Sequence, residues 1–407
     1  MSLSEHAAQL KAYTEEHRRS VVGFLRDICR IPSMDSQIRQ VGERIGEEME
    51  RLGFDEVRFD RMGNILGRIG DGPVSVMFDS HIDTVGLGDE SAWQWDPFEG
   101  KVEDGVLYAR GACDEKGSTP GMVYGLAALK ALGLHRDFTL WYFGNMEEWC
   151  DGIAPHALHT VEGVEPDYVI IGEPTKMNVY RGHRGRLEIE CLTKGKACHA
   201  AMPHLGVNAI QNMARFLRSV DAYAPTIRTD PFLGRGTVVP SIIQSKSPSI
   251  NAVPDECTAF LDRRMTAGET KDSVLSELRA LDGADVIQFK EMYYEEPSYT
   301  GYVFKVDKYF PAWVTPADHV LVKAGRLAKE TLWGDPGMED GKWDFSTNGI
   351  YWAGKAGIPS IGFAPSNEIY AHTIEDQVPI EDAVQATSWY GLLPLALKSL
   401  GAPGRRG

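Results

Sequence analysis

The sequence predicts an α/β fold that carries a second, inserted α+β domain, and three observations support this prediction. The chain has 407 residues, more than the roughly 250 to 300 that one hydrophobic core usually accommodates. In its first part, short apolar runs alternate with amphipathic helical patterns, which is typical of a sheet with parallel strands. In its middle part, the expected elements follow the order β-α-β-β-α-β of a ferredoxin-like unit.

The first part of the chain contains three apolar runs that end in polar residues, as buried strands do on leaving a sheet. Apolar residues at helical spacing separate these runs, and each helical pattern is followed by a glycine, which favours the end of a helix. Ligands of such a sheet gather outside the carboxyl ends of its strands. We expect helices at 36–52 and 119–132, and strands at 73–78, 138–143 and 168–171.

The middle of the chain has a different order of elements. Loops that carry acids and histidine resume only at 361–376. We therefore place an inserted domain at 183–294, between two segments of the first domain at 1–182 and 295–407. Within the insert we expect strands at 187–193, 237–244, 258–264 and 286–289, and helices at 207–220 and 270–281.

Charge and composition argue against several classes of protein. The 42 Lys and Arg residues and 58 Asp and Glu residues give a formal charge of −16, which disfavours nucleic acid and anionic membranes as partners. The sequence has no run of about 18 apolar residues and no signal-peptide pattern at its start, so we expect a cytoplasmic protein. The six cysteines form no C-x-x-C pair, which predicts buried thiols rather than disulfides or a thiolate zinc site.

Five segments rich in acids and histidine each have an ordinary explanation when taken singly. In His81-Ile82-Asp83, strand spacing directs both polar side chains to one side, so the carboxylate could orient a metal-bound imidazole. A solvated loop is the simpler alternative. Asp114 precedes a helix and could be its N-cap. The remaining candidates, each typical of a solvated loop or a surface histidine, are Glu147, Glu148, Glu173 and His372.

Taken together, these segments predict a metal centre. If the strand ends meet, three carboxylates and two imidazoles converge. They belong to Asp114, Glu148, Glu173, His81 and His372. Two unit charges about 4 Å apart repel by roughly 4 kcal/mol at an effective dielectric near 20, so three unpartnered carboxylates would not stay ionised together. Two divalent cations would balance this charge. Oxygen and nitrogen ligands without sulfur suit zinc, with cobalt or manganese as alternatives.

The chain also resembles a known family, the co-catalytic dizinc amidohydrolases and exopeptidases of metallopeptidase clan MH. This family includes acetylornithine deacetylase, succinyl-diaminopimelate desuccinylase and glutamate carboxypeptidase, and the resemblance covers nearly the whole chain. It implies a zinc-exopeptidase-like catalytic domain with an inserted ferredoxin-like lid and dimerisation domain. The motifs that carry it are Ser80-His81-Ile82-Asp83-Thr84-Val85, Trp95-Asp96-Pro97-Phe98, Arg110-Gly111-Ala112-Cys113-Asp114-Glu115-Lys116-Gly117, Glu147-Glu148, Gly172-Glu173-Pro174-Thr175 and His372-Thr373-Ile374-Glu375-Asp376.

The resemblance implies the ligands of two divalent metal ions, most simply zinc. Asp114 bridges the ions. His81 and Glu173 complete one site, and Glu148 and His372 complete the other.

The resemblance also implies two supporting roles in the hydrolysis of an amide bond. Asp83 orients His81, and Glu147 is the general base that takes a proton from the bridging water and passes it to the leaving amine. The substrate is a small N-acyl amino acid, a dipeptide or a related molecule that carries a carboxylate.

Three residues of the insert match the same family. His199, in Gly195–Pro203, corresponds to a histidine that reaches across a homodimer to stabilise the oxyanion in the partner's active site, and a packed loop histidine is the alternative. Asn251 and Arg264 correspond to positions that hold substrate oxygens, and an arginine suits a carboxylate because it binds bidentately. Whether Arg263 or Arg264 faces the substrate stays open at this point.

Other functions find less support in the sequence. Gly349–Ala356 approximates a phosphate-binding loop, but its interior is aromatic and alanine follows the lysine. The motifs H-E-x-x-H and G-x-S-x-G are absent from the sequence. Cys198 beside His199 could suggest a thiol nucleophile, although sequence neighbours rarely form such a dyad. The remaining alternative is a non-catalytic metal-binding or regulatory member of the same fold, which should lack a ligand or the base.

Overall fold

The larger part of the chain is organised around a six-stranded sheet in the computed structural model, which describes residues 1–339 and 341–404. The central strands are parallel and almost entirely buried, whereas the first two strands pair antiparallel. Parallel strands end at a common edge, so residues that follow them become neighbours. The order in the sheet is β1(Glu56–Phe59), β2(Ile65–Ile69), β6(Phe138–Asn145), β3(Val74–His81), β7(Tyr168–Ile171) and β19(Ser360–Gly362).

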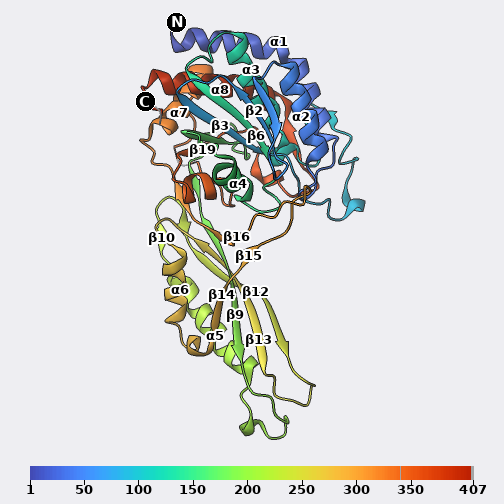
Figure 1. The fold of residues 1–407 in the computed structure, drawn as a ribbon, viewed down its shortest axis with the longest axis vertical. Coiled ribbons are helices and arrows are strands. Elements are labelled where there is room, and N and C mark those ends of the chain that lie inside the picture. Colours follow the sequence, from blue (N-terminus) through green and yellow to red (C-terminus); the bar gives the residue numbers. More distant parts are fainter. Residues whose placement is uncertain (340, 405–407) are drawn as a thin grey trace.

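Helices cover this sheet, and four of them form one packed layer that lies above the sheet in Figure 1. Glycine allows two of the four to approach closely, because a Cβ atom at Gly125 of α3 would lie 2.9 Å from the backbone oxygen of Thr387 in α8. The packed helices are α1(Leu3–Cys29), α3(Thr119–Ala131), α7(Val320–Trp333) and α8(Ile380–Ser399); α2(Arg39–Arg51) packs on β2, and α4(Ile153–Glu162) lies nearer the insert.

The insert projects from this region as a second sheet with two helices on one of its faces (Figure 1). All of its strand pairs are antiparallel, and its apolar core is separate from that of the larger domain. The sheet order is β12(Thr237–Lys246), β13(Glu256–Met265), β9(Gly185–Lys194) and β14(Gln288–Glu291), with β17(Tyr309–Phe310) also on β9; the helices are α5(Ala209–Tyr223) and α6(Lys271–Arg279).

Strict alternation along β13 sends its two adjacent arginines to opposite faces. Arg263 faces the helices and is fully buried, where it pairs with Glu269. Arg264 is on the open face of the sheet and is partly exposed.

The two connections between the insert and the larger domain lie side by side. β8(Gly182–His183) pairs with β18(Trp313–Val314), and β17 pairs with the start of β9. The chain therefore enters and leaves the insert through a ribbon held by backbone hydrogen bonds.

Short strands complete the described part of the chain. They form a small sheet of β20(Gln377–Pro379), β5(Val106–Tyr108) and β4(Lys101–Glu103), and the pairs β10(Thr229–Asp230) with β11(Gly234–Arg235) and β15(Tyr293–Tyr294) with β16(Val306–Asp307).

All six cysteines are free and five are buried, which confirms the prediction of buried thiols. None of the helices in the described ranges is long and apolar enough to cross a bilayer.

The predicted α/β fold class with an added α+β unit is confirmed, and the differences lie at element ends. The strand expected at 73–78 continues to His81, and the strand expected at 138–143 continues to Asn145, because these two residues still pair with each other across the sheet. The insert sheet includes β17, which lies beyond residue 294. The domain boundaries at 182/183 and 294/295 stay predictions.

The buried pair of Arg263 and Glu269 gives a test of the insert's stability. Glu269→Gln leaves the guanidinium without a counter-charge, so we expect a loss of about 3 to 5 kcal/mol in the free energy of unfolding of the insert. Urea unfolding followed by far-UV circular dichroism measures this loss. Tryptophan fluorescence should change less, because all nine tryptophans lie outside residues 183–294.

The matched control is Glu190→Gln, which removes an exposed ion pair with Lys290. This control should change the free energy of unfolding by no more than about 0.5 kcal/mol. Equal effects of the two substitutions would contradict the assigned role of the buried pair.

Candidate metal centre

The predicted metal ligands come together at the carboxyl edge of the six-stranded sheet. His81 is the last residue of β3, Glu148 follows β6, and Glu173 follows β7. Asp114 lies in the turn at Ala112–Lys116, between β5 and α3, and His372 lies in the loop after β19. The parallel strands thus bring together side chains that are up to 291 residues apart in the sequence.

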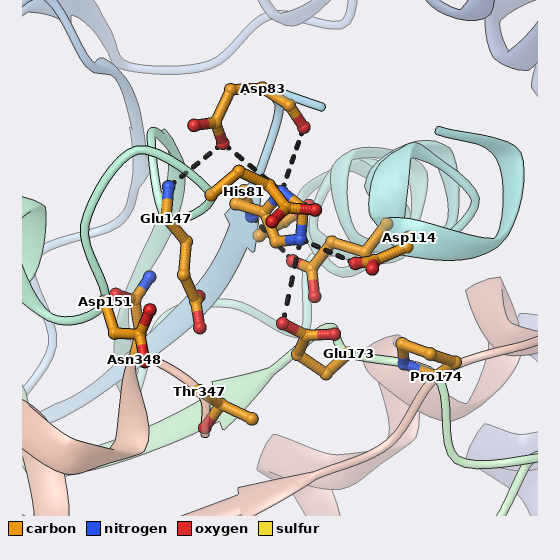
Figure 2. Close-up of polar contacts among 12 residues, drawn as sticks. His81, Asp83, Asp114, Glu147, Asp151, Glu173, Pro174, Thr347 and Asn348 are labelled. Carbon is orange, nitrogen blue, oxygen red and sulfur yellow. Dashed lines mark hydrogen bonds and ion pairs between the residues drawn. The ribbon is translucent and has the colours of Figure 1, made fainter. Parts of the chain in front are cut away.

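The carboxylate of Asp114 lies between the two imidazoles. Its Oδ1 atom is 2.8 Å from Nε2 of His81, and its Oδ2 atom is 3.3 Å from Nε2 of His372. Nε2 of His81 is also 3.6 Å from Glu173, and Nε2 of His372 is 2.8 Å from Glu148. Figure 2 shows Asp114 and Glu173 on the same side of the His81 ring.

These side chains form two groups of donors that share Asp114. In each group, one possible ligand atom from every residue lies within 4.8 Å of the others. One group is His81, Asp114 and Glu173, and the other is Asp114, Glu148 and His372. The donors are oxygen and nitrogen atoms, which zinc, cobalt and manganese all accept as ligands. In addition, Oε2 of Glu173 is buried without a hydrogen-bond partner, so the residues present fit two divalent cations.

The electrostatics of the protein alone are unfavourable at this site. Burial and the nearby acids raise the pKa of Glu173 well above its usual value, and burial also raises the pKa of Glu148. Burial would likewise raise the pKa of Asp114, but hydrogen bonds from His372 and His81 outweigh it and lower this pKa. Hydrogen bonds to Asp114 and Glu148 raise the pKa of His372 to about 10. The acids and imidazoles therefore compensate one another by sharing protons that a bound cation would displace.

Asp83 connects His81 to the segment that follows β6. Nδ1 of His81 lies 3.0 Å from the backbone oxygen of Asp83 and 3.3 Å from its carboxylate. The same carboxylate accepts the backbone N–H groups of Glu147, at 2.9 Å, and Trp149, at 3.1 Å. Asp83 is fully buried, so its geometry suits a group that orients the imidazole.

Glu147 is buried beside the donor groups, and its Oε1 atom has no hydrogen-bond partner in the described part of the chain. Burial raises its pKa well above the usual value; His81 opposes this shift, and Glu115 adds to it. A carboxylate with raised proton affinity suits a general base. Its role stays a prediction.

A cavity of about 560 Å³ opens onto both donor groups and Glu147. The insert contributes Arg264 to its wall, whereas Arg263 is buried with Glu269. Of the two adjacent arginines, Arg264 is therefore the one placed to meet a ligand. A volume of this size suits a small molecule.

The structure does not bring His199 and Asn251 to this cavity. Their two segments pair with each other, since His199 forms a β-bridge with Ala252 and the N–H of Ala200 donates to the backbone oxygen of Asn251. The segments around 199 and 251 lie at the end of the insert farthest from the larger sheet (Figure 1). Neither residue lines the cavity, so the roles of His199 and Asn251 stay predictions.

Asp376 positions the turn that carries Asp114, a role that the sequence did not indicate. Its buried carboxylate accepts the backbone N–H groups of Gly111 and Cys113, both at 2.7 Å, and pairs with Arg110 at 3.0 Å. Asp376 lies four residues after His372. It therefore links the loop of one predicted ligand to the turn of another.

A second network behind the site was also missed. Asp79 is buried in β3 and accepts hydrogen bonds from Asn145, Asn348 and Trp352 at 2.5 to 3.0 Å. The side-chain oxygen of Asn348 accepts the N–H of Gly152, at 3.0 Å. Asp79, an acid directly after the apolar run 76–78 of β3, was the available sequence signal. The network fixes the segment that contains the two glutamates.

The sequence has relatives along nearly its full length. A sequence model of peptidase family M20/M25/M40 matches residues 77–395. YgeY of Escherichia coli strain K12, an uncharacterized protein, is 41% identical over 385 residues, which cover 94% of this chain and 95% of YgeY. The succinyl-diaminopimelate desuccinylase of Magnetococcus marinus is 29% identical over 280 residues, which cover 65% of this chain and 73% of that enzyme.

Solved structures share the fold. Aminopeptidase PepT from Bacillus cereus has a TM-score of 0.71 at 16% identity and covers 94% of this chain and 99% of its own. The YXEP protein of Bacillus subtilis, described as a dinuclear metal binding peptidase of the M20 family, has a TM-score of 0.69 at 13% identity, with 95% and 99% covered. Human carnosine dipeptidase 1 has a TM-score of 0.67 at 14% identity, with 97% and 100% covered.

Replacement of Asp83 tests its place in the site. Asp83→Asn keeps the shape of the side chain but removes the charge that faces the imidazole and the N–H groups of Glu147 and Trp149. We expect metal affinity to fall about 10- to 100-fold, measured by competition with a chromogenic chelator. The matched control Asp71→Asn changes an acid outside the cavity and should leave the affinity unchanged. Equal metal affinity in both variants would show that Asp83 does not support metal binding.

Proposed function

The chain belongs to peptidase family M20/M25/M40, and from this we propose that it is a two-metal deacylase or exopeptidase of the acetylornithine deacetylase type. Family membership makes it a hydrolase of amide bonds and a metallopeptidase. The proposed substrate is a small N-acyl amino acid, a dipeptide or a related molecule that carries a carboxylate. The proposed cofactors are two zinc ions, with cobalt or manganese as alternatives.

One observation carries this proposal: two donor groups share the Asp114 carboxylate beside the buried, unpartnered carboxylate of Glu147. His81 and Glu173 would hold one ion, Glu148 and His372 the other, and Asp114 both. Bound divalent ions would polarise the scissile carbonyl and lower the pKa of water toward about 7.

The protein's own groups would then move the protons. Glu147 lies at the cavity and can accept a proton from the attacking water and donate it to the leaving amine. Asp83 accepts the backbone N–H of Glu147 and faces the ring of His81. It therefore fixes the position of the proposed base relative to the proposed metal ligand. The burial of Glu147 excludes bulk water from the proton that it carries.

A residue of the insert supports the proposal that the substrate is small and carries a carboxylate. Arg264 reaches the cavity wall and can bind such a group bidentately. The related desuccinylase from Magnetococcus marinus is named for removal of a succinyl group, which is a reaction of the proposed kind.

We also infer a homodimer that forms through the insert. Strand β12 is an edge strand, and it exposes Val239, Ile242 and Ile243 by more than half of each side chain. Exposed apolar edges of this kind favour association. In such a dimer, His199 of one copy would stabilise the oxyanion in the other, and Asn251 would contact substrate oxygens there.

A substrate screen tests the proposed function. Purified protein is loaded with zinc, cobalt or manganese and incubated with N-acyl amino acids and dipeptides, and released amine is measured. Hydrolysis that a chelator abolishes and added metal restores is the expected result. Metal binding without hydrolysis of any compound would instead favour the non-catalytic alternative.

Removal of the base gives a second test. Glu147→Ala should retain both metals, measured by elemental analysis, yet lose turnover by roughly a hundredfold or more. Glu368→Gln is the control, because Glu368 lines the cavity but belongs to neither donor group, and its effect on turnover should be much smaller. Near-normal turnover in Glu147→Ala would remove it from the mechanism.

The role of His199 is tested by complementation between copies. His199→Ala and Glu147→Ala should each be inactive alone, but a mixed dimer contains one centre with both groups intact. We expect turnover to reappear after the two variants exchange subunits, measured with the substrate found in the screen. If exchange is verified by differently tagged chains and turnover does not recover, His199 does not act across the dimer.

A further inference from the structure

The wall of the cavity that faces the metal centre contains two arginines from neighbouring strands of the insert. Arg186 of β9 and Arg264 of β13 are directly paired in the sheet register, and both line the cavity. Like charges directly opposite each other on one face of a sheet are destabilising. Such a pair therefore requires anions close by.

Arg264 already has an anion in its own strand. Its Nε and Nη2 atoms donate to the carboxylate of Asp262 at 2.8 and 3.2 Å. A third cation of the same wall, Lys308, lies 3.0 Å from Glu188. Each of these two side chains therefore has a carboxylate within the chain to which it donates a hydrogen bond.

Arg186 differs from both. Its nearest carboxylates, Asp151 and Glu188, lie at 3.4 and 3.7 Å, and its guanidinium donates no hydrogen bond in the described part of the chain. Its Nε atom is buried without a partner. Both neighbouring acids have closer partners, because Asp151 accepts from the hydroxyl of Ser346 and Glu188 accepts from Lys308.

The position of Arg186 is nevertheless fixed. Its guanidinium lies over the ring of Phe310, at 4.5 Å from the centroid, and only 23% of the side chain is exposed. A stacked, permanently charged guanidinium whose N–H groups donate no hydrogen bond matches a carboxylate in shape and charge. Holding it in place before binding lowers the entropic cost of recognition.

We propose that Arg186 is the specificity-determining residue that binds the substrate's carboxylate in this chain. The inference rests on the proposed function and deepens it, because it assigns substrate recognition to a residue that the sequence did not single out. Arg264, which is hydrogen-bonded to Asp262, contributes less than Arg186 to the binding of this carboxylate. The substrate is therefore an amide whose carboxylate lies on the β9 side of the cavity, away from the two donor groups.

A purely structural role is the competing explanation, since Arg186 also bridges the insert to Asp151 in the segment after the glutamates. The two roles differ in one measurable respect. Recognition affects only substrates with a carboxylate, whereas a structural role affects all substrates alike.

The experiment compares N-acetyl amino acids with the corresponding N-acetyl amino acid amides, which lack the charge. Wild type, Arg186→Met and Arg186→Lys are loaded with metal, and kcat and KM are measured for the best acid in the panel and its amide. Arg186→Met should lower kcat/KM for the acid by about 30-fold or more, mainly through KM. The amide should change little, and Arg186→Lys should recover part of the loss.

Two controls accompany this comparison. Arg184→Met removes a neighbouring arginine outside the cavity and should preserve the preference for the acid. Asp151→Asn removes an ionic partner of Arg186. On our proposal this variant should keep the preference for the acid over the amide, which Arg186→Met should lose. Melting temperatures establish that each variant is folded.

Calorimetric titration of the same acids and amides into Glu147→Ala, with and without Arg186→Met, measures binding independently of turnover. Loss of the preference for acids in the double variant supports the proposal. A preference that persists, or an equal loss for acids and amides, overturns it. Absence of hydrolysis in wild type would overturn the proposed function, and the titration would still decide the role of Arg186.

Discussion

The carboxylate of Asp114 lies between two imidazoles, and most of the larger domain is arranged to bring these three groups together. His81 ends the central strand, Asp114 lies in a turn before a helix, and His372 arrives from a loop near the end of the chain. Glu148 and Glu173 add further negative charge at the same edge of the sheet. Burial disfavours every one of these charges, so the site is most stable when cations share it.

Buried charges around the site hold the ligand-bearing turns in place. Asp376 accepts two backbone N–H groups on one side of the Asp114 turn. On the other side, the ammonium group of Lys116 donates to the backbone oxygens of Ile28 and Ile31 at the end of α1, at 3.1 and 2.9 Å. A cation is favourable at the carboxyl end of a helix. The turn is thus fixed from both directions before any ligand binds.

Local patterns predicted much of this molecule, and long-range contacts account for what they missed. Polar residues at strand ends marked His81, Glu147, Glu148 and Glu173 because parallel strands share an edge. Helix α8 was not predicted, since it is buried on all sides from Ala383 to Leu397 and shows no polar face. The contact of Asp79 with Asn348 joins residues 269 apart in sequence. The environment of Arg186, which makes two ion pairs but donates no hydrogen bond in the described ranges, depends on sheet register and on the partners of its neighbours. A linear pattern does not show either.

The paired connections of the insert have a consequence for the ancestry of the fold. Because β8 lies beside β18 and β9 beside β17, the two ends of the insert are neighbours in space. Domains with adjacent termini are readily gained or exchanged as units. A short turn could join the two ends without disturbing the strand order of the main sheet. Substitutions in the insert can therefore change the wall of the cavity without altering the strands that position the two donor groups.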